Sequence, residues 1–304
     1  MIRIVGAGMA GLLAANMLRH KSPLVLEQQA SLPNNHSAVL RFRSHIVGDV
    51  TGTEFRKVDI IKATLPWKNA IADSMAYADK NTGTLRSDRS LPSDPIRAER
   101  YIAPPNFISQ LAYNSDIRYG ITNAFNFDSK GKPTISTIPM PALMKILGYP
   151  EAPLGLFKSN QSTNVIAKVK DCDAYVSLYV PDPSFAFSRV SITGDEIVAE
   201  CPFGATENDV FTAAHLLGIH RQRLSDVKMK EQAYAKIQPV SEEVRKRFIA
   251  WASDEYNVYS LGRYACWRPS TLLDDLVQDI RHIERWINQG GHYARKLHHN
   301  RKVS

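Results

Sequence analysis

Three glycines near the start of the chain are spaced to let a phosphate approach the backbone. Gly6, Gly8 and Gly11 form a G-x-G-x-x-G pattern directly after a short apolar run. The first glycine of such a pattern permits a tight turn, the second exposes bare backbone to a pyrophosphate, and the third allows close contact between helix and strand. The N–H groups of Met9 and Ala10 would open the following helix and point toward the phosphates. The spacing predicts a site for the pyrophosphate of a dinucleotide.

An acidic residue follows these glycines at the distance expected of a nucleotide-binding βαβ unit. We expect residues 2–5 to form a buried strand, residues 10–20 a helix with small side chains on one face, and residues 24–26 a second strand. Glu27 comes directly after that second strand, with Gln28 beside it. Because an ionised carboxylate only accepts hydrogen bonds, Glu27 would hold the hydroxyls of an adenosine ribose and repel a 2′-phosphate. This disfavours NADP.

A second sheet is predicted later in the chain. Four runs alternate apolar and polar residues across hairpin-length gaps, as antiparallel strands do: residues 164–169, 174–180, 187–192 and 196–201. Helices are expected over residues 207–217, 241–252 and 271–288, the last with a continuous apolar stripe. The predicted fold class is α/β, with a Rossmann-type nucleotide-binding domain on a parallel sheet and a second, substrate domain on an antiparallel sheet.

Three later segments resemble those of a known family. Residues 260–267 read Ser-Leu-Gly-Arg-Tyr-Ala-Cys-Trp, residues 135–139 form a strand-to-proline turn, and residues 179–191 belong to the second sheet. Together with the opening motif, they resemble the glutathione-reductase-type flavoprotein superfamily, in the branch that contains amine oxidases and UDP-galactopyranose mutases. The resemblance implies that the cofactor is FAD.

With that cofactor, we expect a discontinuous FAD-binding domain. It would comprise residues 1–50, 106–148 and 250–290. Residues 51–105 and 149–249 would form the substrate domain, and residues 291–304 a basic tail.

The resemblance also implies which residues contact FAD. Arg263 would lie along the pyrophosphate or the flavin and Trp267 would pack on the ring, the alternatives being an ion pair and a core aromatic. A helix beginning near Pro269 would aim its positive end at the flavin N1–C2=O edge. Family members carry a Gly-Gly-Arg cluster after the acidic residue, which this chain lacks, and Arg41 or Arg43 is expected to replace it as a phosphate partner. The expected cofactor residues are Gly6, Gly8, Met9, Ala10, Gly11, Glu27, Gln28, Arg41, Arg43, Pro139, Gly262, Arg263, Trp267, Thr271 and Leu272.

Candidates for a cavity facing the flavin lie on the second sheet. They are Tyr175, Tyr179, Phe187 and Arg189. Packing within the sheet and a buried salt bridge are the alternative roles. The catalytic candidates are Tyr179, Arg189 and Trp267, while His36 and His45 are acid–base candidates against a structural or solvated role. The sequence shows no Ser-His-Asp or metal-binding constellation, so no metal is expected.

Three functions remain open at this stage. The first is amine-oxidase-like oxidation of a C–N bond, in a small molecule or in an amino-modified nucleotide or DNA base. The second is a sugar-nucleotide mutase resembling UDP-galactopyranose mutase, which uses reduced FAD and clamps a diphosphate with arginines. The third is a non-catalytic flavin- or nucleic-acid-binding module, whose binding to DNA would be salt-sensitive.

Composition and charge are those of a soluble globular protein. The chain has 304 residues, 44% of them hydrophobic and 22% charged, and a net charge of +8. Basic residues gather in the tail, where they would contact nucleic acid or a phosphorylated substrate, or remain solvated: Arg295, Lys296, Arg301 and Lys302. Without an apolar run of membrane-spanning length or a signal peptide, we expect a cytoplasmic protein that does not enter a membrane. The three cysteines are expected to be reduced thiols: Cys172, Cys201 and Cys266.

Overall fold

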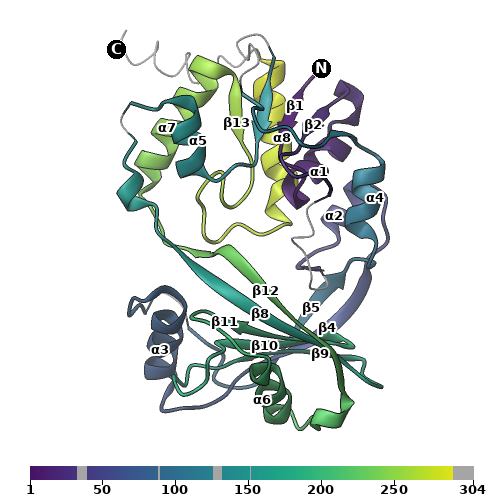
Figure 1. The fold of residues 1–304 in the computed structure, drawn as a ribbon, viewed down its shortest axis with the longest axis vertical. Coiled ribbons are helices and arrows are strands. Elements are labelled where there is room, and N and C mark those ends of the chain that lie inside the picture. The colour runs from purple at the N-terminus through teal and green to yellow at the C-terminus, as the bar shows by residue number, and fades with distance from the viewer. Residues whose placement is uncertain (33–39, 88–89, 126–131, 151, 290–304) are drawn as a thin grey trace.

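Two sheets organise the protein in the computed structural model, which describes residues 1–32, 40–87, 90–125, 132–150 and 152–289. Within these residues, sheet A has five strands, all parallel, and sheet B has eight strands, mostly antiparallel. Sheet A with its helices forms the upper layer of Figure 1, and sheet B lies below it. The predicted α/β fold class, with one parallel and one antiparallel sheet, is confirmed.

Sheet A is assembled from segments far apart in the chain. Its strand order is β13-β7-β1-β2-β6. The strands are β1 (Arg3–Val5), β2 (Leu24–Leu26), β6 (Asp116–Arg118), β7 (Thr134–Ser136) and β13 (Val258–Ser260). Its helices are α1 (Met9–Met17), α2 (Ile46–Thr51), α4 (Phe107–Tyr113), α5 (Met140–Leu147), α7 (Glu242–Tyr256) and α8 (Asp275–Asn288). A parallel sheet needs cover on both faces. Here α1 and α8 share one hydrophobic cluster, while α5 and α7 share another.

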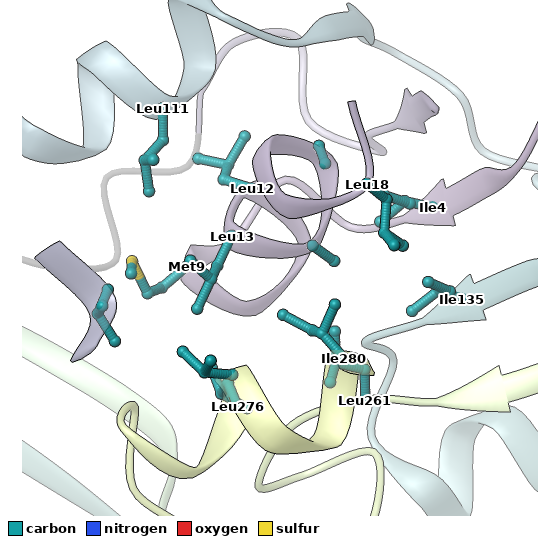
Figure 2. Close-up of a cluster of buried hydrophobic side chains, with 14 of the residues drawn as sticks. Ile4, Met9, Leu12, Leu13, Leu18, Leu111, Ile135, Leu261, Leu276 and Ile280 are labelled. Atoms are coloured by element: carbon teal, nitrogen blue, oxygen red, sulfur yellow. The ribbon is translucent and has the colours of Figure 1, made fainter. Parts of the chain in front are cut away.

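The packing of α8 against α1 joins the two ends of the described chain. Leu276 and Ile280 on α8 point toward α1, where Leu13 faces them (Figure 2). Ile280 and Leu13 have no exposed surface. The apolar stripe predicted for the last helix therefore covers α1.

Sheet B has one apolar and one polar face. Its strand order is β12-β8-β11-β10-β9-β4-β5-β3. The strands are β3 (Arg41–Phe42), β4 (Arg56–Thr64), β5 (Ile96–Ile102), β8 (Ser159–Val169), β9 (Ala174–Tyr179), β10 (Arg189–Gly194), β11 (Glu196–Cys201) and β12 (Leu224–Ile237). Helix α6 (Asn208–Leu216) packs on the apolar face, on the side away from sheet A in Figure 1. Helix α3 (Ala70–Thr82) contacts β8 and β12, and short 3-10 turns occupy Arg19–Lys21, Leu154–Leu156 and Arg221–Arg223.

The course of the chain between the sheets refines the proposed domain boundaries. β3 pairs with β5 and so lies in sheet B, although residues 1–50 were assigned to the nucleotide-binding side. Helix α7, which packs on β13, begins at Glu242, ahead of the expected boundary at residue 250. If the domains follow the sheets, we propose that the second boundary moves to about Ser241 and that within residues 1–50 only β3 belongs to sheet B, because α2 packs on α1 and α8.

Replacing Ile280 with alanine should destabilise the protein by about 2–5 kcal/mol, because it leaves a cavity between α8 and α1. Ile146 on α5 is 51% exposed, so Ile146→Ala is the matched control, with an expected change within about 0.5 kcal/mol. Chemical denaturation of both variants would compare the free energies of unfolding. Equal losses would contradict the proposed packing of α8.

Candidate functional site

The carboxyl ends of β1, β7 and β13 bring three loops together. β1 leads into the glycine turn, β7 into the loop before α5, and β13 into the loop before α8. The loops are bonded to the neighbouring strands: Thr137 Oγ1 donates to Val5 O at 2.9 Å, and Leu261 N donates to Ser136 O at 2.9 Å. In open α/β sheets, ligands bind at this edge.

The three glycines of the turn differ in what requires them. Gly6 has a φ of +101°, and a Cβ there would lie 2.2 Å from Thr137 Oγ1. A Cβ on Gly11 would lie 2.0 Å from Gly6 O, so this glycine lets α1 pack on the turn. Gly8 has a φ of −71° and a ψ of 176°, which any residue adopts, and a Cβ there would have no described residue within 4 Å. The described part of the chain therefore gives no reason for glycine at position 8, whereas a ligand lying against its bare backbone does.

The first turn of α1 can receive an anion. Gly8 is the N-cap of α1 and makes no side-chain capping bond, and the first turn holds no acidic residue. Leu12 N donates to Gly8 O at 3.0 Å, so the regular helical bonds begin only there. The amides of Met9 and Ala10 precede that first bond, at the positive end of the helix dipole. The Met9 side chain is buried in the core, so only its backbone lies at the turn.

The predicted ribose partner is bonded to the glycine turn. Glu27 is 7% exposed; its Oε2 accepts a hydrogen bond from Ala7 N at 2.6 Å, and its Oε1 accepts one from Gln29 N at 2.9 Å. A carboxylate offers about four acceptor positions, so acceptor capacity remains for ribose hydroxyls. Gln28 beside it is exposed.

The loop after β13 reaches the glycine turn. Gly262 has a φ of +99°, and a Cβ there would lie 3.3 Å from the Ala10 Cβ, which places this loop against the start of α1. Next to it, Arg263 Nε is buried and has no hydrogen-bond partner among the described residues. Because a buried polar group without a partner is costly, this orphaned N–H fits a ligand at the junction. Pro139, which ends the loop after β7, is the N-cap of α5.

Trp267 is a core aromatic residue, which was the alternative to its predicted contact with the flavin. Its indole has no exposed surface, and its Nε1 donates to Gln238 O at 2.9 Å. The ring packs edge-on against Phe157, with the centroids 5.1 Å apart. The indole therefore has no exposed face on which a flavin could stack.

The last helix begins later than the sequence pattern suggests. α8 starts at Asp275, whereas the prediction began it at Thr271. The reason is local bonding: Leu272 N donates to Asp275 Oδ2 at 2.8 Å, and Thr271 N donates to Arg268 O at 3.1 Å. Both amides expected to face the flavin thus already have acceptors within the protein.

The polar face of sheet B carries most of the remaining candidates. In the strand register, Arg189 lies opposite both Tyr179 and Glu200, and these side chains alternate with the residues packed on α6. Arg189 Nε donates to Glu200 Oε1 at 2.8 Å, and Arg189 Nη2 also bonds to this carboxylate. Burial opposes ionisation of Glu200, but Arg189 and Lys236 hold the pKa of its carboxyl below the usual value. Arg41 Nη1 donates to the Ser177 hydroxyl on this face at 3.3 Å.

The other candidates make contacts of their own. Arg43 is exposed, and its backbone N–H is bonded to Asp274. Phe187 is buried in the cluster under α6, and the Tyr175 hydroxyl donates to Asp173. His45 is exposed and paired with Asp49, while His36 and the basic tail fall outside the described residues. No metal-binding group of His, Cys, Asp or Glu occurs among the described residues.

Cys266 lies near the loop after β13 but is not an activated thiol. Burial raises the pKa of its thiol to about 11, and its Sγ donates to Ser260 O at 3.3 Å. At neutral pH it is therefore protonated and a poor nucleophile.

Sequence reasoning missed Ser177 and Glu200. Both belong to the predicted strands, but their relation to Arg41 and Arg189 depends on strand register and on β3 joining the same sheet. The period-two alternation around Arg189 was the available signal, because it places Ser177, Tyr179 and Glu200 on one face once the strands are paired.

Comparisons with known proteins support the fold. No family model and no curated protein sequence matches the chain. Among solved structures, reduced UDP-galactopyranose mutase is similar with a TM-score of 0.69 at 14% identity, covering 95% of this chain and 94% of that one. An oxidoreductase from Methanosarcina mazei has a TM-score of 0.60 at 9% identity, covering 93% and 99%. The ternary complex of aklavinone-11 hydroxylase with FAD and aklavinone has a TM-score of 0.50 at 13% identity, covering 96% of this chain and 62% of that one.

These similarities are structural and span nearly the whole chain in each case. The chain thus shares its fold with structures of flavoenzymes.

No helix among the described residues is long and apolar enough to cross a bilayer.

Substituting alanine at two of the glycines should separate ligand binding from folding. Gly8→Ala should leave the free energy of unfolding of the apo-protein within about 0.5 kcal/mol of wild type. It should weaken dinucleotide binding by at least about tenfold, because the methyl group fills the space above bare backbone. Gly11→Ala should destabilise the apo-protein by about 1–3 kcal/mol through its clash with Gly6 O. Thermal unfolding and FAD titration would check both variants, and unchanged FAD affinity in Gly8→Ala would contradict this pyrophosphate site.

Proposed function

We propose that the protein is an FAD-dependent oxidoreductase. The observation that carries the proposal is the bare backbone at Gly8, at the N-terminus of α1, where neither the backbone conformation nor packing by the described residues requires glycine. A pyrophosphate bound there would be stabilised by the first amides of the helix. The shared fold with flavoenzyme structures supports the same cofactor.

The residues around the turn fit the parts of FAD. Glu27 would accept hydrogen bonds from the adenosine ribose, while the α1 N-terminus and the orphaned Arg263 Nε would bind the pyrophosphate. FAD, when bound, would be the electron acceptor for oxidation of the substrate. We propose that the polar face of sheet B orients that substrate.

The finer proposal is amine-oxidase-like oxidation of a C–N bond. Such a reaction needs the amine in its neutral form. Arg41 and Arg189 place positive charge on the polar face, and nearby positive charge disfavours protonation of an amine. A small amine, or one carried by a nucleotide or DNA base, is the proposed substrate class.

Substrate-dependent reduction of the flavin tests this function. The purified protein should be yellow, release FAD on denaturation, and bleach under anaerobic conditions with at least one member of a panel of amines, amino acids and aminated nucleosides. Protein that binds no FAD when offered it would overturn the cofactor proposal. Protein that binds FAD but is bleached by no amine would overturn the amine-oxidase proposal alone.

The similarity to reduced UDP-galactopyranose mutase over 95% of this chain and 94% of that one favours a sugar-nucleotide mutase as the second candidate. This reading predicts conversion of UDP-galactopyranose only after dithionite reduction of the protein. A third outcome, flavin binding without either activity but with salt-sensitive retention of DNA, would indicate a non-catalytic module.

A further inference from the structure

We propose that Arg41 binds an anionic group of the substrate, a carboxylate or a phosphate, on the polar face of sheet B. This inference rests on the proposed function, because it treats that face as the substrate side. It differs from the sequence prediction, in which Arg41 was expected to contact the phosphates of the cofactor.

The position of Arg41 links it to sheet B. Arg41 lies in β3 opposite Ile102 of β5, and its Nη1 donates to Ser177 Oγ on β9 at 3.3 Å. Its side chain therefore extends along the polar face toward Arg189. It is only partly exposed, so part of its surface remains accessible to a ligand.

The charges around Arg41 do not balance. Glu200 Oε1 accepts hydrogen bonds from two nitrogens of Arg189, and Lys236 Nζ lies 3.9 Å from Glu200 Oε2. Arg100, another cation near Arg41, donates from Nη1 to a backbone carbonyl, that of Glu99. Among the described residues, neither Arg41 nor Arg100 has a carboxylate within ion-pair distance.

The local electrostatics favour an anion beside Arg41. Burial, repulsion by Arg189 and repulsion by Arg100 lower the pKa of Arg41 to about 10, with the attraction of Glu200 only partly opposing them. An anion placed against the guanidinium would relieve both the repulsion and the lost hydration. The planar fork of N–H groups matches two oxygens of a carboxylate or a phosphate.

Arg41→Met tests the inference, with Arg97→Met as the matched control. Arg97 is exposed on β5, and its position alternates with Arg100, so it lies on the opposite face of sheet B. Binding of inorganic pyrophosphate and of benzoate would be measured by calorimetry at constant ionic strength, on the apo-protein and on the FAD-loaded protein. We expect Arg41→Met to lower the affinity for the probe by about tenfold to a hundredfold, and Arg97→Met to leave that affinity unchanged. Arg41→Lys keeps the charge but lacks the planar fork, so its affinity for the probe should lie between those of Arg41→Met and Arg97→Met.

The outcomes separate substrate from cofactor. Arg41-dependent binding of either probe with unchanged FAD affinity supports the inference; stronger pyrophosphate binding indicates a phosphorylated substrate, and stronger benzoate binding a carboxylate. If wild type binds neither probe, or Arg41→Met binds as wild type does, the inference is overturned. It is also overturned if Arg41→Met loses FAD but keeps the probe. If wild type takes up no FAD but shows Arg41-dependent probe binding, the anion site stands and the proposed function fails.

Discussion

The close contact between helix α1 and the turn before it sets the geometry of the proposed nucleotide-binding site. Gly11 lies so near Gly6 O that a methyl group would come within 2.0 Å of that oxygen. This contact fixes how far the first amides of α1 stand from the end of β1, and it allows Leu12 and Leu13 to be fully buried beneath. Helix α8 covers α1 from the other side, so the position of the turn depends on packing from both ends of the described chain.

The opposed faces of sheet B explain how one sheet can both contribute to the core and carry the proposed substrate site. Alternation along β10 sends Val190 and Ile192 into the cluster under α6, and Arg189 and Ser191 to the other face. The apolar face stabilises the sheet by burial, which leaves the polar face free to carry charge. Glu200 offsets the charge of Arg189 by pairing with it, but it does not neutralise the face as a whole.

Sequence reasoning succeeded for the local structure at the N-terminus, but it failed at one local side-chain hydrogen bond and where the structure depends on distant partners. The strand, turn and helix at the N-terminus were predictable because their signals lie within about 25 residues. The start of α8 was misplaced because an aspartate side chain captures the Leu272 amide. The contact between Arg41 and Ser177 spans 136 positions and depends on register, while the bond from Ser44 to Asp274 spans 230. The periodicity of single strands contains no information about either pairing.

The chain crosses between the sheets several times, and this path has a consequence for biosynthesis. β1, the central strand of sheet A, pairs with β7, and β7 pairs with the edge strand β13, so the sheet is complete only after residues 258–260 have been synthesised. The loop that brings Gly262 against Ala10 follows still later. During translation the glycine turn emerges from the ribosome long before its partners, and contacts of such long range form slowly. Any ligand held between these loops therefore binds only after Gly262 has been synthesised, and its occupancy reports on the assembly of sheet A.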